Sequence, residues 1–122
     1  MTLITWLFLA AALLPIVGAG CAKAGGKGFD NNEPRPWLGS LHGWRARANA
    51  AQANTFEALP FFFAASLFAL YKNASVQTLA SLMAAWVIVR LAYIAVYIWG
   101  RGGIRSLIWM LALALNIAIL FS

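Results

Sequence analysis

Two apolar stretches decide the fold of this chain: ANAAQANTFEALPFFFAASLFALY at residues 48–71 and SVQTLASLMAAWVIVRLAYIAVYIWG at residues 75–100. Each holds one charged residue in its interior, Glu57 in the first and Arg90 in the second. A charge at the centre of a bilayer costs about 3 kcal/mol, so it usually faces a partner or a polar cavity. Each charge lies about ten residues, or ~15 Å of helix, from a basic loop end. We therefore expect a polar site at a shared depth between these segments.

The composition is that of one small membrane domain covering residues 1–122. The chain is 63% hydrophobic and 10% charged, with a mean hydropathy of +0.79. Soluble domains are nearer 45–50% apolar and about 25% charged. Four segments approach or exceed the ~20 residues that cross a bilayer. We expect an all-α, up-down-up-down bundle of four transmembrane helices, at about 2–22, 46–71, 75–100 and 104–121.

The basic residues indicate the orientation of these spans. One face, formed by the first and third loops, holds seven of them, and the opposite face holds only Lys72. The seven are Lys23, Lys27, Arg35, Arg45, Arg47, Arg101 and Arg105. The positive-inside rule then places these loops in the cytoplasm and both termini outside it. An alternative is that the N-terminal segment is a cleaved signal, but it lacks the basic start that such signals carry.

Other functional classes are less well supported by the residues. The net charge of +6 follows from loop asymmetry rather than from a basic face, so we do not expect nucleic-acid binding. His42 has no second ligand nearby, which argues against a metal site. Cys21 is interpreted as a packing residue. Asn116 is most simply an interhelical hydrogen bond.

Polar residues recur on one face of each central segment. Arg47, Asn54 and Glu57 share a face by their helical spacing, whereas Gln52 lies roughly opposite. The next segment shows the same spacing, because Arg90, Tyr93 and Tyr97 share one face of it. Arg105 lies at the start of the last segment. Such a set suits a small anionic, zwitterionic or peptide-like ligand, because arginine can hold a carboxylate bidentately. A guanidinium can also stabilise a thiolate. The alternative is a buried Glu57–Arg90 ion pair that only fixes the register of the helices.

These residues resemble the MAPEG family, the membrane-associated proteins in eicosanoid and glutathione metabolism. The resemblance rests on RARANAAQANTFEALPFF at residues 45–62, VRLAYIAVYIWGRGGIRS at residues 89–106 and the four-span layout. It implies a homotrimer with glutathione bound between subunits near the cytoplasmic side. It further implies that Arg105 activates the thiol, that Asn54, Glu57, Arg90, Tyr93 and Tyr97 contact the tripeptide, and that Gln52 does so from the adjacent subunit.

The chain is similar to a divergent bacterial-type member, which would lie in the inner membrane. The better-known members of the family carry an arginine where this chain has Ala50, and some also where it has Ala53. Arg47, one turn earlier on the same face, could compensate in part.

Two functional hypotheses follow from the resemblance and the residues. In the first, the protein is a membrane-embedded, glutathione-dependent transferase or peroxidase acting on lipophilic electrophiles. In the second, motivated by Ala50 and Ala53, it is not catalytic, and its polar helix faces serve trimer assembly or partner binding. Small-molecule transport is a weaker third possibility, because four helices in one chain show no inverted repeat.

Overall fold

The computed structural model describes all 122 residues and contains helices but no strands. Four helices are long and apolar enough to cross a membrane: α1 (Thr2–Lys23), α3 (Gly43–Tyr71), α4 (Val76–Trp99) and α5 (Gly102–Phe121). This confirms the expected all-α class. A short helix, α2 (Pro34–Gly39), lies in the first loop and was not predicted.

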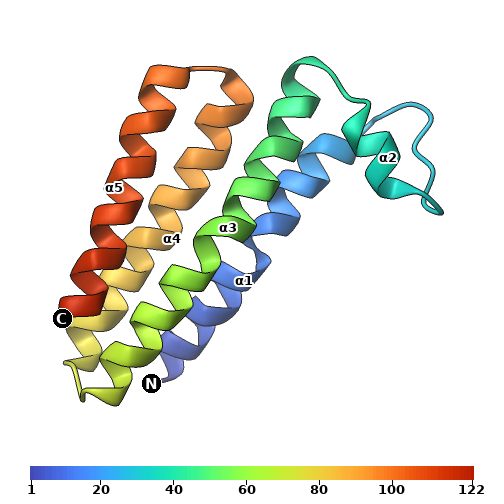
Figure 1. The fold of residues 1–122 in the computed structure, drawn as a ribbon. Helices are drawn as coiled ribbons and strands as arrows, with labels where there is room; N and C mark the ends of the chain where they lie inside the picture. The colour runs from blue at the N-terminus through green and yellow to red at the C-terminus, as the bar shows by residue number, and fades with distance from the viewer.

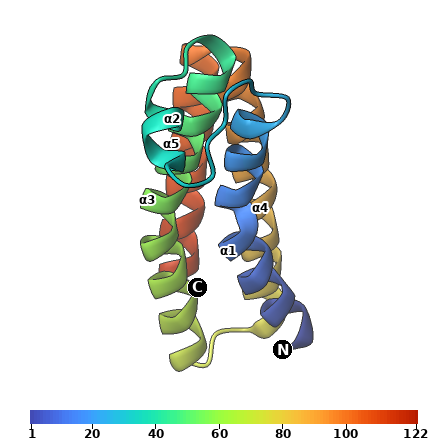
Figure 2. The same cartoon turned by 90° about the vertical axis from the view of Figure 1, so that its right-hand side faces the viewer.

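The four long helices run alternately up and down (Figure 1). The α1–α3 connection and the α4–α5 turn lie at one end of the bundle, and α2 overhangs that end (Figures 1 and 2). Both termini and the α3–α4 turn lie at the other end. Asn73 takes a positive φ of 61° in the α3–α4 turn, and Gly100 ends α4 with a φ of 89°. Glycine is suited to such a left-handed helix end, because it has no Cβ to clash.

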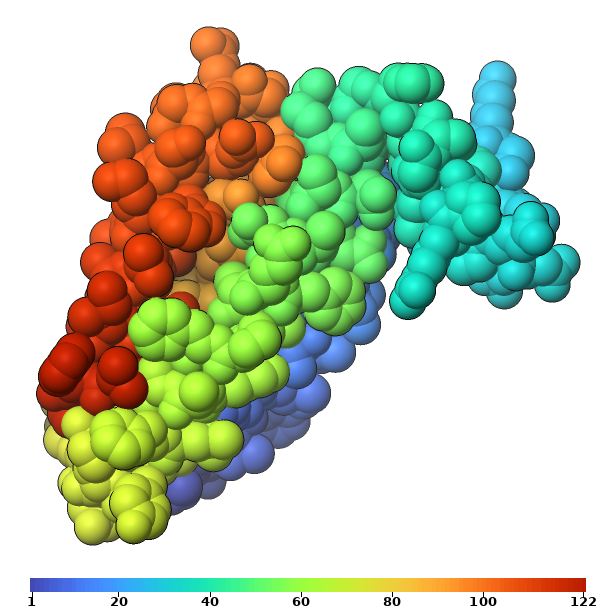
Figure 3. Space-filling model, viewed as in Figure 1, coloured from blue at the N-terminus to red at the C-terminus, as the bar shows by residue number.

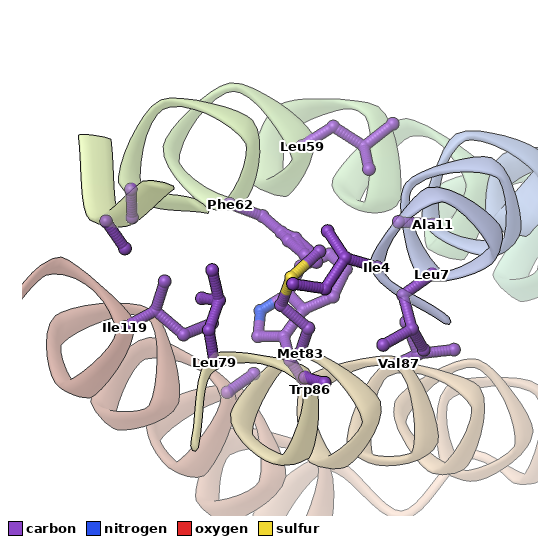
Figure 4. Close-up of a cluster of buried hydrophobic side chains, with 14 of the residues drawn as sticks. Ile4, Leu7, Ala11, Leu59, Phe62, Leu79, Met83, Trp86, Val87 and Ile119 are labelled. Atoms are coloured by element: carbon purple, nitrogen blue, oxygen red, sulfur yellow. The ribbon is translucent and has the colours of Figure 1, made fainter. Parts of the chain in front are cut away.

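The core lies between α1, α3 and α4, with α5 adding to one side (Figure 4). Phe62 and Trp86 are fully buried and stack with their ring centroids 4.0 Å apart. Ile4, Leu79 and Met83 close around this pair. Aromatic pairs of this kind add about 0.5–1.5 kcal/mol beyond the area they bury. This contact joins α3 to α4 in the half of the bundle that holds the termini.

Small residues bring α1 and α3 close together. Ala11, Ala48 and Ala51 are fully buried. A Cβ on Gly18 would lie 3.1 Å from the backbone oxygen of Ala48 and 3.1 Å from the backbone nitrogen of Gln52. Lipid offers no hydrophobic drive between helices, so association depends on close van der Waals contact of this kind.

Basic side chains cap the last turns of three helices. Arg45 donates to the Ala22 carbonyl of α1 at 2.9 Å, and Lys72 donates to the Leu120 carbonyl of α5 at 3.0 Å. The third cap is Arg47, whose Nε donates to the Ile98 carbonyl of α4 at 3.0 Å. The last carbonyls of a helix have no partner within it, so each of these bonds satisfies a group that would otherwise depend on water.

Helix α5 contacts α4 and, less extensively, α3. Only Ala112, Asn116 and Ile119 of this helix are buried. At the loop end of the bundle, α4 and α5 diverge from α1 and α3 (Figure 1). A hollow lined by side chains of α3, α4 and α5 lies in this region.

The close approach at Gly18 predicts a position-specific effect. Gly18→Ala should lower stability by about 1–3 kcal/mol, because the added methyl meets α3 backbone that cannot move without separating the helices. Gly20→Ala is the matched control on the same helix, since nothing lies within 4 Å of its Cβ position. The measurement is denaturant titration of each variant in detergent. Equal effects at the two positions would contradict the packing described here.

Candidate functional site: a polar cleft between α3, α4 and α5

The best-buried charge of the protein is Arg90, which is 1% exposed on α4. Its Nη2 donates to Asn54 Oδ1 at 2.9 Å and to Thr55 Oγ1 at 3.2 Å, both on α3. Thr55 in turn donates its hydroxyl proton to the Ala51 carbonyl at 2.7 Å, so its oxygen lone pairs face the guanidinium. Arg90 Nε has no partner within the chain. The guanidinium is therefore held on one side and unsatisfied on the other.

Glu57 does not neutralise this charge. It is exposed, and the hydrogen bonds of Arg90 go to Asn54 and Thr55 instead. The alternative of a buried Glu57–Arg90 ion pair is therefore wrong for the single chain. The physical reason is position: Asn54 lies one turn closer to the loop end than Glu57 and already offers Arg90 an amide oxygen. Glu57 remains at the rim, where water or a ligand can reach it.

Glu57 and Arg90 nevertheless line one cleft, of about 230 Å³, between α3, α4 and α5. Figure 3 shows this region as a hollow between α3 in green and α5 in orange to red, with α4 behind. The side chains that line it are Asn54, Glu57, Ala58, Phe61, Trp86, Arg90, Trp109, Ala112, Leu113 and Asn116. The cleft thus combines a charged rim with a largely apolar interior.

A second cleft, of about 430 Å³, continues the first toward the loop end. It is lined by Asn54, Tyr93, Tyr97, Arg105, Ser106, Trp109 and Met110. Asn54 and Trp109 line both spaces, so the two clefts form one continuous surface. We call this surface the polar cleft.

Arginine and tyrosine side chains alternate along the polar cleft. The Arg90 guanidinium lies 4.2 Å from the ring centroid of Tyr93, and that of Arg105 lies 4.4 Å from Tyr97. The two rings meet edge to face with centroids 5.7 Å apart. A cation over an aromatic face is stabilised electrostatically. Each guanidinium is therefore held in place without a carboxylate partner and keeps its charge available to a ligand.

Two of the predicted site residues lie elsewhere. Arg47 donates a hydrogen bond to the Ile98 carbonyl and lines neither part of the polar cleft. Its expected role in ligand binding is not supported by this position. Gln52 lies on the other side of α3, in a separate hollow with Arg35, Asn49 and Phe56. Its Oε1 is buried without a partner.

The structure also adds residues that sequence reasoning missed. Trp86 and Trp109 line the cleft. Asn116 lines it too, but its buried Oδ1 has no partner, so the predicted interhelical hydrogen bond is not formed within the single chain. Trp109 and Asn116 are seven residues apart on α5, a spacing that places them on one face. From this spacing, the sequence could have predicted that Trp109 and Asn116 line the same surface. Burial of Trp86 depends on tertiary packing and left no local signal.

The protein is similar over residues 3–122 to the MAPEG family model. The match covers essentially the whole chain, including every residue of the polar cleft.

The chain belongs to the MAPEG family.

No curated protein and no solved structure matches it significantly. Together with four apolar helices of spanning length, membership identifies an integral, multi-pass membrane protein of the family of glutathione and eicosanoid metabolism. No group of three or more His, Cys, Asp or Glu side chains gathers in the structure to hold a metal ion.

Proposed function

We propose that this MAPEG protein is a glutathione-dependent transferase or peroxidase that acts on lipophilic electrophiles taken from the bilayer. The observation that carries the proposal is the continuity of the polar cleft. One surface joins a free carboxylate, Glu57, to two guanidinium groups, Arg90 and Arg105, that no carboxylate neutralises. Glutathione carries an ammonium group and two carboxylates, so its charges complement this set.

The residues divide between binding and chemistry. Glu57 and Arg90 would hold charged ends of the tripeptide, with Asn54 between them. Tyr93 and Tyr97 would position it from the α4 wall. Arg105 would stabilise the thiolate, which is the nucleophilic form of the thiol.

The reaction then proceeds from the thiolate. Its sulfur attacks an electrophilic carbon, a carbon–sulfur bond forms, and the leaving group departs with the bonding electron pair. With a hydroperoxide, sulfur attacks oxygen and the O–O bond breaks. A second glutathione completes the reduction, giving glutathione disulfide, an alcohol and water.

The assembly that we propose is a homotrimer. Gln52 faces away from the polar cleft, and its buried, unpartnered Oε1 suits a contact made across a subunit boundary. Ala50 and Ala53 stand where better-known relatives are expected to carry arginines, so Arg90 and Arg105 would supply the positive charge here. This substitution predicts weaker glutathione binding than an arginine-rich site would give.

We further propose that the bundle end with the α4–α5 turn faces the cytoplasm of a bacterial cell, placing both termini outside. This orientation is supported by the seven basic residues at that end of the bundle, compared with Lys72 alone at the opposite end. Reporter fusions at residue 73 and at the C-terminus should both report the non-cytoplasmic side, and a fusion in the α1–α3 loop the cytoplasm. A cytoplasmic C-terminus would reverse the orientation.

Replacing Arg105 should separate binding from chemistry. Arg105→Leu should reduce turnover of glutathione with an activated aryl halide by at least tenfold, because the thiolate loses its nearest cation in a low-dielectric site. Binding, measured by calorimetry in detergent, should weaken less, since Glu57 and Arg90 remain.

Arg101→Leu is the matched control. Arg101 lies four residues earlier, stacks on Trp99 at 4.7 Å, and lines neither part of the polar cleft. It should leave turnover within about twofold. No glutathione binding by the unmodified protein at several millimolar, or equal effects of the two substitutions, would refute the enzymatic proposal and favour the non-catalytic alternative.

A further inference from the structure

The charges of the polar cleft do not balance those of the ligand proposed for it. Glutathione with an ionised thiol carries two carboxylates, a thiolate and one ammonium group. The ammonium and one carboxylate share a carbon atom, so Glu57 and Arg90, which line the same part of the cleft, can bind both. Arg105, in the other part, stabilises the thiolate. The glycine carboxylate, at the far end of the tripeptide, is left without a cation.

The other basic residues at this end of the bundle were compared as partners for that carboxylate. Four of them lie on helix-end carbonyls or over aromatic rings: Lys23, Arg45, Arg47 and Arg101. Lys27 is exposed and lines none of the hollows of the structure. Arg35, on α2, is exposed and does line a hollow. It is the basic side chain best placed to bind an anion outside the polar cleft.

The hollow beside Arg35 is built to bind a carboxylate. It has a volume of about 290 Å³ and lies where α2 packs beside α3 (Figure 2). Asn49, Gln52 and Phe56 line it from one face of α3, as their helical spacing requires. The amides of Asn49 and Gln52 can donate hydrogen bonds, and a guanidinium can bind a carboxylate through two parallel bonds. Ala53 also lines the hollow and adds only a methyl group beside them.

A ring of three subunits can bring this hollow to the polar cleft of a neighbour. A cyclic trimer is held by heterologous interfaces, in which one face of a chain contacts a different face of the next. Gln52 and Glu57 are five residues apart, or about 140° around α3, so the hollow and the cleft lie on different faces. Gln52 and Asn54 differ in depth by only about 3 Å, and rotation about the membrane normal preserves depth. The hollow of one subunit therefore lies level with the cleft of the next.

We propose that Arg35 binds the glycine carboxylate of a glutathione molecule held in the polar cleft of the neighbouring subunit, with Asn49 donating to the same group. This inference rests on the proposed glutathione-dependent function and adds a binding residue to it. The ligand is then held by two chains, with its γ-glutamyl end bound by Glu57 and Arg90 of one subunit and its glycine end by Arg35 of the other.

The first test compares two ligands on the full chain in detergent. Glutathione ethyl ester differs from glutathione in that its glycine carboxylate is esterified and carries no charge. Calorimetry of the unmodified protein should show the ester bound about tenfold more weakly than glutathione, because a hydrogen-bonded charge is lost. Equal affinities would overturn the inference without the use of any variant.

A substitution then assigns the lost contact to Arg35. Arg35→Gln should weaken glutathione binding about tenfold and leave binding of the ester unchanged, because the ester lacks the group that Arg35 binds. Lys27→Gln is the matched control, since Lys27 is an exposed cation of the same loop that lines no hollow. It should leave both affinities within about twofold. Equal effects of the two substitutions on glutathione would overturn the inference, because only the general charge of the loop would then matter.

Mixed trimers show which subunit each Arg35 serves. Subunits with Arg35→Gln and subunits with Glu57→Gln are co-expressed with different tags, and trimers that contain both are purified. If Arg35 acts across the boundary, every mixed trimer has one cleft with Glu57 beside a neighbour with Arg35, and glutathione binds there with unmodified affinity. If Arg35 serves its own subunit, every cleft keeps a defect, and the absence of such a site would overturn the inference.

Glutathione binding by the unmodified protein keeps the two proposals distinguishable. Binding that responds neither to esterification nor to Arg35→Gln refutes the Arg35 contact alone. Absence of glutathione binding refutes the proposed function, and the Arg35 contact with it.

Discussion

The bond between Arg90 on α4 and Asn54 on α3 is the interaction on which the rest of this structure depends. A guanidinium inside a membrane-spanning helix lowers the stability of the protein unless it is paired or solvated. Here it is paired with an amide and a hydroxyl rather than with a carboxylate. The positive charge is therefore positioned but not neutralised. A rigid, uncompensated charge beside a cleft is a better starting point for anion binding than a closed ion pair would be.

Uneven packing of the helices keeps that charge accessible. Small residues draw α1 and α3 together, and the Phe62–Trp86 contact joins α3 to α4. Helix α5 packs mainly on α4, contacts α3 less extensively, and buries only Ala112, Asn116 and Ile119. In lipid, helices associate through close packing and polar contacts rather than through the hydrophobic effect. Helix α5 thus follows α4 rather than closing onto α3, and the polar cleft occupies the space between α3 and α5.

The fold was predictable from the sequence because it depends on strong, additive signals. Four apolar segments of spanning length and short turns at Lys72–Ala74 and Gly100–Gly103 leave few alternatives to an up-and-down bundle. The short helix α2 was missed, although Pro34 at its start is a recognised signal for a first helical turn. A helix of one to two turns within a glycine- and asparagine-rich loop carries too little periodicity to detect.

The site was predictable only in part, because helical spacing identifies a face but not the partner across it. Asn54, Glu57, Arg90, Tyr93, Tyr97 and Arg105 do line the polar cleft. Charge alone favoured Glu57 as the partner of Arg90, whereas the packing of α3 against α4 places Asn54 and Thr55 beside the guanidinium. Arg47 shares that face too, yet its side chain hydrogen-bonds to the Ile98 carbonyl at the end of α4. Such choices arise from tertiary geometry, which local spacing does not encode.

A pair of double-mutant cycles in detergent tests the central claim most directly. In the first cycle, the free energy of unfolding is measured for Asn54→Leu, Arg90→Leu and the double variant. In the second cycle, it is measured for Glu57→Leu alone and combined with Arg90→Leu. If Asn54 holds Arg90, the first pair should couple by about 0.5–3 kcal/mol, because losing Asn54 matters little once the guanidinium is gone. Glu57 and Arg90 should be additive within about 0.5 kcal/mol. Additive effects for Asn54 and Arg90, with strong coupling between Glu57 and Arg90 instead, would show that an ion pair organises the cleft and would contradict the account.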